Sequence, residues 1–175
     1  MLLSSCSKDD DNTPVIPNEE EIITSLIYTL VPDNGGDNVI LSFRDLDGDG
    51  GNAPVISTSP LAQNTSYQGR LVLLNESVTP SEEINGEITE EDEEHQFFFQ
   101  TQGGAVIDLS YDDQDSNGNP IGLETRLTTT EATQGQLVIT LRHEPNKTAD
   151  GVKDGLIGNA GGETDIEVSF ELTVQ

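Results

Sequence analysis

"DIEVSFELTV", Asp165 to Val174, alternates apolar and polar residues more cleanly than any other stretch of the chain. Apolar side chains occupy every second position, at Ile166, Val168, Phe170, Leu172 and Val174. Successive side chains of an extended strand point to opposite faces of a sheet. The stretch therefore predicts a β-strand with one face in a core and the other in solvent.

Similar runs of β-branched, aromatic and aliphatic residues recur before this stretch, separated by clusters of Gly, Asn, Asp and Pro. They cover residues 22–31, 39–44, 67–75, 95–101, 105–111, 124–130 and 136–142. Helical periodicity is limited to a short turn at residues 81–84. The pattern predicts an all-β fold, an antiparallel β-sandwich of immunoglobulin-like or transthyretin-like size with seven or eight strands.

Length and charge restrict the classes of partner. The chain has 175 residues, enough for one domain, which we place at residues 22–175. It carries 33 acidic and 7 basic residues, a net charge of -26. Such a charge repels phosphate backbones and anionic membrane surfaces, so nucleic acid is excluded as a partner. No apolar run approaches the ~20 residues of a membrane helix.

The only cysteine, Cys6, follows Leu3, Ser4 and Ser5. This order resembles a bacterial lipobox, in which the chain is cut before a cysteine that then carries lipid. We interpret residues 1–5 as the remnant of a lipoprotein signal peptide and Cys6 as the lipidated residue. The alternative is a free cysteine in a polar tail.

The residues that follow Cys6 indicate where in the cell the protein resides. They resemble the acidic export signal of surface lipoproteins of the Bacteroidota, and comprise Ser7, Lys8, Asp9, Asp10 and Asp11. Residues 6–21 then form the lipidated cysteine and an acidic tether, broken by Pro14 and Pro17. The resemblance implies a lipid-anchored, surface-exposed protein of the outer membrane, held to the bilayer by its lipid alone.

Two acidic loops follow similar strands, at residues 41–54 and 109–120. Calcium loops place oxygen ligands at alternate positions, then a glycine and a closing carboxylate. The second loop meets this pattern with Asp113, Asp115, Asn117 and Glu124. The first loop offers Asp45, Asp47 and Asp49 but lacks the closing carboxylate. Both are calcium candidates; the alternative is that both are acidic turns, since turns favour the same residues.

The two histidines, His95 and His143, lie at the ends of predicted strands, beside Glu94 and Glu144 respectively. If the two strand ends meet, imidazoles and carboxylates would form a site for zinc or another transition metal. If they do not meet, both are surface histidines. A haem scavenger that uses both histidines is a further alternative.

Catalytic motifs are missing from the sequence. There is no G-x-S-x-G elbow, no H-E-x-x-H helix and no phosphate-binding glycine loop. With 33 carboxylates and no Trp, a glycosidase pair cannot be assigned. We therefore expect a protein that is not an enzyme.

Together with the lipidated start, three segments resemble small acidic surface lipoproteins of flavobacteria: "EEHQFFF" (93–99), "LRHEPNK" (141–147) and "NAGGETDIEVSFELTV" (159–174). Members of this group are sometimes labelled with a type 1 periplasmic-binding fold, but such a fold needs two α/β lobes. The group is associated with TonB-dependent receptors. The resemblance implies a calcium-stabilised binding module that captures a ligand or metal for such a receptor; the alternative is a structural or adhesive surface protein.

Overall fold

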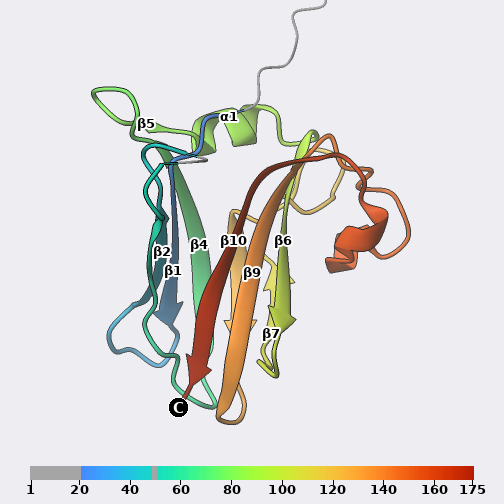
Figure 1. The fold of residues 1–175 in the computed structure, drawn as a ribbon. Helices are drawn as coiled ribbons and strands as arrows, with labels where there is room; N and C mark the ends of the chain where they lie inside the picture. The colour runs from blue at the N-terminus through green and yellow to red at the C-terminus, as the bar shows by residue number, and fades with distance from the viewer. Residues whose placement is uncertain (1–20, 49–50) are drawn as a thin grey trace, which may run out of the picture.

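Two antiparallel sheets face each other in the computed structural model, which describes residues 21–48 and 51–175 (Figure 1). The larger sheet contains seven strands in the order β3-β2-β1-β4-β8-β7, with β5 on β4. These strands are β1 (Ser25–Pro32), β2 (Val39–Arg44), β3 (Val55–Ser57), β4 (Ser66–Asn75), β5 (Glu82–Glu83), β7 (Asp108–Tyr111) and β8 (Glu124–Thr128). The smaller sheet, in the order β10-β9-β6, consists of β6 (His95–Gln102), β9 (Thr133–His143) and β10 (Glu163–Val174). The predicted all-β sandwich is confirmed.

The core lies between the two sheets and follows the alternation of the strands. The five apolar residues at alternate positions of β10 are each at most 9% exposed. They pack with the inward side chains of the larger sheet, among them Leu26, Tyr28 and Leu71, which are fully buried. The face assignment made from the period of β10 is therefore correct.

The structure has more elements than the sequence indicates. Two short strands, β3 and β5, bring the described residues to ten strands instead of seven or eight. Their residues are all exposed, so no apolar period marked them. A helix, α1 (Asn85–Glu90), follows the turn expected at 81–84 and buries Ile88. In the described part of the chain, no helix is long and apolar enough to cross a membrane.

The first residues of β9 and β7 differ from the sequence prediction, and in both cases glycines lie near the start of the strand. β9 begins at Thr133 and passes through Gly135, where a Cβ would lie 2.3 Å from the backbone oxygen of Gln102. Gly135 therefore permits close approach of β6 instead of ending the strand. By contrast, β7 begins only at Asp108, after Gly103 and Gly104 turn the chain with positive φ.

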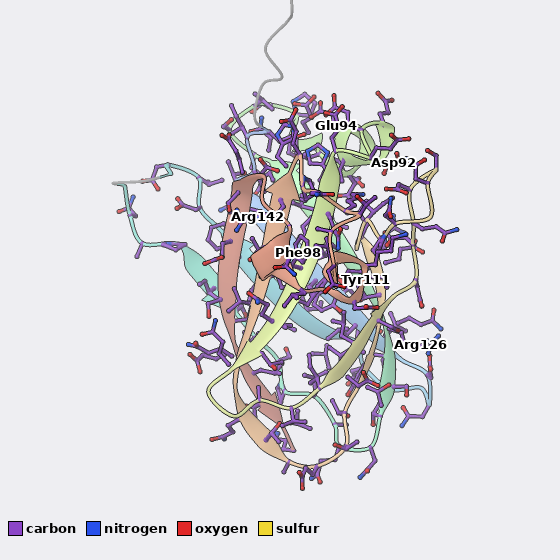
Figure 2. The ribbon with its side chains drawn as sticks, turned by 90° about the vertical axis from the view of Figure 1, so that its right-hand side faces the viewer. Asp92, Glu94, Phe98, Tyr111, Arg126 and Arg142 are labelled. Carbon is purple, nitrogen blue, oxygen red and sulfur yellow. The ribbon has the colours of Figure 1, made fainter. Side chains whose placement is uncertain are left out.

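One end of the sandwich gathers several segments (Figure 1). There β6 begins, β9 ends, β10 begins, and Glu21 leads into β1, with α1 alongside. The long connection between β9 and β10 includes the 3-10 helices η1 (Val152–Asp154) and η2 (Ile157–Asn159). This connection covers the outer side of β6 by packing Val152 and Ala160 on Phe98 (Figure 2).

Candidate metal centre

The two histidines meet at this end because of strand register. His95, the first residue of β6, pairs directly with His143, the last residue of β9. Their rings stack with centroids 4.8 Å apart and an interplanar angle of 27°. Both are buried, at 0% and 6% exposure. The strand ends thus meet, which the sequence left open, and the alternative of two surface histidines is wrong.

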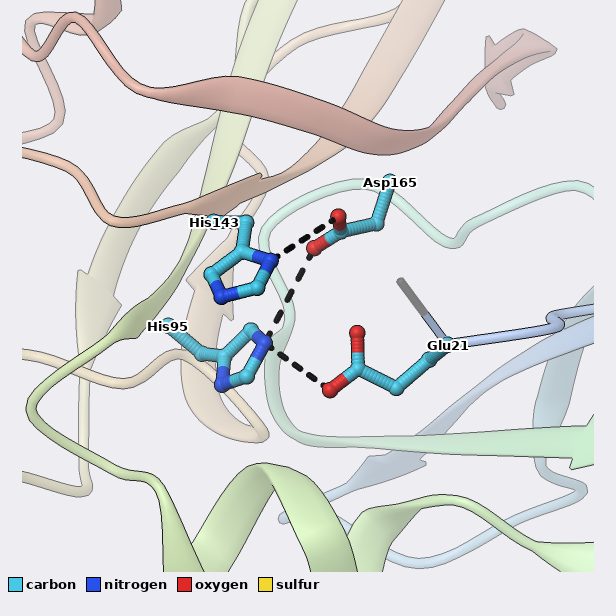
Figure 3. Close-up of side chains that lie close together, drawn as sticks. All are labelled: Glu21, His95, His143 and Asp165. Atoms are coloured by element: carbon cyan, nitrogen blue, oxygen red, sulfur yellow. Dashed lines mark ion pairs between the residues drawn. The ribbon is translucent and has the colours of Figure 1, made fainter. Parts of the chain in front are cut away.

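A third side chain, that of Asp165, comes from β10 through a break in register. Thr164 pairs with Arg142 and Ile166 with Leu141, so Asp165 is the extra residue between two regular pairs. An extra residue of this kind re-aims a side chain that would otherwise point outward. The Asp165 side chain is 1% exposed, and its Oδ1 lies 3.7 Å from Nδ1 of His143 (Figure 3).

The fourth side chain, Glu21, belongs to the segment that leads into the larger sheet. Its side chain is 5% exposed, and its Oε1 lies 3.0 Å from Nε2 of His95. The same Nε2 lies 3.9 Å from Oδ2 of Asp165. Figure 3 shows the two carboxylates on one side of the stacked rings. We call Glu21, His95, His143 and Asp165 the inner centre; one ligand atom from each lies within 4.8 Å of the others.

Hydrogen bonding prepares His95 to act as a ligand. Its Nδ1 lies 3.2 Å from the backbone oxygen of Glu91, and because a carbonyl only accepts, Nδ1 carries the proton. Metal-binding histidines commonly fix their tautomer in this way. Nε2 of His95 faces Oε1 of Glu21, and the other carboxylate oxygen, Oε2, is buried and makes no hydrogen bond within the described residues. These atoms are directed into the inner centre.

Protonation of His95 is coupled to Glu21. Burial by itself would lower the pKa of His95, but the adjacent Glu21 carboxylate more than offsets it and the pKa is raised. Conversely, burial would raise the pKa of Glu21, yet contact with His95 lowers it overall. A positive charge is therefore favoured between the two side chains, and a proton supplies it when no other cation is bound.

A second group adjoins the inner centre. Nε2 of His143 lies 3.9 Å from Oε2 of Glu94, and ligand atoms of Glu94, His143 and Glu144 also lie within 4.8 Å of one another. We call these three residues the outer group. The predicted set of both histidines with Glu94 and Glu144 is thus divided: the two glutamates accompany His143, whereas His95 meets Glu21 and Asp165.

The second aspartate loop is organised around an ammonium group instead of calcium. Nζ of Lys147 lies 3.1 Å from Oδ2 of Asp115 and 3.0 Å from the backbone oxygen of Pro120, and it also donates to the backbone oxygen of Asp92. Lys147 is 4% exposed and the Asp115 side chain 0%. A cation of the chain already takes these oxygens, so the expected calcium at Asp115 is corrected.

The other predicted calcium ligands of this loop either accept hydrogen bonds from the backbone or are exposed. Asp113 accepts hydrogen bonds from the backbone nitrogens of Gly122 and Glu124. Asn117 is exposed, as is Glu124. In the described residues these carboxylates do not form a group that could hold a metal ion. The loop resembles a calcium loop because turns use the same residues.

The first aspartate loop likewise forms turns. Asp45 accepts from the backbone nitrogens of Asp47 and Gly48, and Asp47 accepts from Asn52. Both are exposed. Asp49 lies outside the described residues, as do Cys6 and the export signal, so the structure leaves those predictions untested.

Comparison of the chain with protein-family models, curated proteins and solved structures yields no match. What defines the molecule is thus an all-β sandwich with a candidate metal centre at one end. Sequence reasoning missed Glu21 and Asp165. Neither residue had a signal in the sequence, because the pairing of β10 with the strand that ends in His143 and the register shift at Asp165 appear only in the structure.

Proposed function

We propose that the protein is a non-catalytic binding module that holds a divalent transition metal, zinc in the first place, in the inner centre. One observation carries this proposal: two stacked histidines and two carboxylates, all buried, converge from β6, β9, β10 and the segment before β1. Imidazole and carboxylate are the ligands that zinc takes besides cysteine.

The distances fit such an ion. Two ligands at about 2.0 to 2.1 Å from zinc in tetrahedral geometry lie about 3.3 Å apart. Three contacts within the inner centre are 3.0, 3.7 and 3.9 Å, and one ligand atom from each of the four residues lies within 4.8 Å of the others, so the side chains would close on an ion by up to about 1.5 Å. Two carboxylates and two neutral imidazoles around a divalent ion are also electrically neutral, which burial favours.

A haem iron suits the geometry less well. The two rings stack on each other with centroids 4.8 Å apart, on strands paired at that point. A macrocycle between them would have to separate β6 from β9. A small ion, by contrast, could bind on the side of the two rings where Glu21 and Asp165 lie, without separating the strands.

For location and partner, we propose a lipid anchor at Cys6, the outer surface of the outer membrane and a TonB-dependent receptor that receives the metal. The lipobox-like start, the acidic residues after it and the net charge of -26, which concentrates cations near the protein, support this assignment. Replacing Cys6 with Ser should release the protein from the membrane fraction. Purification from membranes should retain a receptor barrel with the parent protein.

The metal proposal is tested by thermal melts of residues 21–175 in EDTA, then with zinc, calcium or magnesium at constant ionic strength. Zinc should raise the melting temperature far more than calcium or magnesium. Glu21→Gln and Asp165→Asn, which keep the side-chain shape, should each lose most of that rise. Glu163→Gln, an exposed position of the same strand as Asp165, is the control and should keep it. Equal responses to the three ions would contradict the proposal.

A further inference from the structure

The inner centre is closed to solvent, which raises the question of how an ion enters. The four side chains are between 0% and 8% exposed. The α1 helix, the strand ends and the chain before β1 surround them (Figure 1). A hydrated ion must exchange its waters for protein ligands before it reaches this position.

The outer group lies where such an exchange can begin. The Glu94 side chain is 51% exposed, and Glu144 is exposed as well. The backbone nitrogen of Glu144 donates to the backbone oxygen of Glu94 over 2.7 Å, which holds the two residues side by side. Figure 2 shows Glu94 at the surface of the end where β6 begins.

His143 connects the two groups. Its Nε2 faces Glu94 at 3.9 Å, and its Nδ1 faces Asp165 at 3.7 Å. Of the residues in the two groups, His143 alone belongs to both. One ring therefore has a nitrogen toward the exposed glutamates and a nitrogen toward the buried carboxylate.

We propose that the outer group is the entry site of the metal: Glu94 and Glu144 take a hydrated divalent transition metal from solvent, and His143 passes it to the inner centre. This inference rests on the proposed function. The step is an exchange of ligands without oxidation or reduction, in which the outer carboxylates are replaced by Glu21 and Asp165. Oε2 of Glu21, which is buried and makes no hydrogen bond within the described residues, marks where the ion arrives.

The test measures the rate at which the metal-free full chain takes up Co²⁺, followed by the visible absorption of the tetrahedral ion in stopped flow. Glu94→Gln/Glu144→Gln should slow loading by about tenfold or more, the lower end of what local charge does to association rates. Its equilibrium affinity for Co²⁺ should change by less than about threefold, since the inner ligands remain.

The control variant is Glu82→Gln/Glu83→Gln, which removes the same charge from the exposed strand β5. It should load within about twofold of the parent. Loading of the outer variant at the parental rate, or an equal delay in the control, would overturn the entry site. A parent that binds no Co²⁺ would instead overturn the proposed function.

Discussion

Lys147 joins three segments at a single atom. Its buried ammonium group holds the backbone oxygens of Asp92 and Pro120 and the carboxylate of Asp115. These residues lie before β6, in the second aspartate loop and at its end. The loop geometry beside the inner centre therefore depends on one side chain in a chain that has only seven basic residues.

Replacing Lys147 with Met should destabilise the protein by about 3 to 5 kcal/mol, because Asp115 would stay buried without its partner. The measurement is urea unfolding at neutral pH. Lys153→Met, which changes an exposed lysine nearby, should stay within about 0.5 kcal/mol. A Lys147 variant as stable as the Lys153 variant would refute the role assigned to the ammonium group.

Asp115 should also make stability depend on pH. Burial alone would raise the pKa of Asp115, but hydrogen bonds from Asn119 and Lys147 lower it overall. A lowered pKa gives stability that is present above the ordinary value of about 3.9 and is lost as pH falls through the lowered value. The stability gap between the parent and Asp115→Asn should therefore narrow from pH 5 to pH 3. Urea unfolding at each pH measures this difference in the free energy of unfolding, and the exposed Glu131→Gln serves as the control. A difference that stays constant with pH would contradict a lowered pKa of Asp115.

At this scale the sequence located the histidines but not their partners. That both histidines lie at strand ends was visible in the sequence, but their pairing depends on which strands are neighbours and was left open. Neighbours in sequence suggested Glu94 and Glu144 as co-ligands, whereas the buried partners are Glu21 and Asp165. Asp165 reaches the site only through a shift in register, and no periodic pattern contains such a shift.

At the scale of elements, Gly135 shows what permits the long strand β9 to pack. A Cβ there would lie 2.3 Å from the oxygen of Gln102 and 2.8 Å from the Cβ of Ala105. Gly135→Ala should destabilise the protein by about 2 kcal/mol or more, since backbone would have to move. Gly158→Ala, where nothing lies within 4 Å, is the control and should be nearly neutral. Urea unfolding compares the two; equal stabilities would show that β6 and β9 adapt without cost.

Long strands that bury one face, such as β4 and β10, were predictable from their alternation. A period of two was also visible in β2 and β9, although β9 buries every residue from 137 to 141. The short strands β3 and β5 were not predictable, because all their residues are exposed and only pairing with a neighbour defines them. The aspartate loops led to a calcium prediction for a related reason, because a turn and a calcium loop use the same local pattern of Asp, Asn and Gly.

For the whole molecule, the net charge of -26 should make stability depend on salt. Like charges repel in the compact state, and added ions screen that repulsion. In EDTA, raising sodium chloride from about 25 to 300 mM should increase the melting temperature, because the Debye length falls from about 20 to below 10 Å. Differential scanning fluorimetry measures this. A melting temperature that stays constant or falls would show that the carboxylates are already compensated within the fold.

The position of Glu21 has a mechanical consequence. This residue is where the described chain enters the domain, and it belongs to the inner centre together with residues of β6, β9 and β10. With an ion bound, a pulling force on the amino-terminal side would reach the ion first and be shared by the smaller sheet. Without the ion, only the contact between Glu21 and His95 would link this segment to the smaller sheet, and most of the load would pass to the pairs of β1 with β2 and β4. Metal binding would then determine whether a domain pulled from its amino-terminal side unfolds one strand at a time or as a single unit.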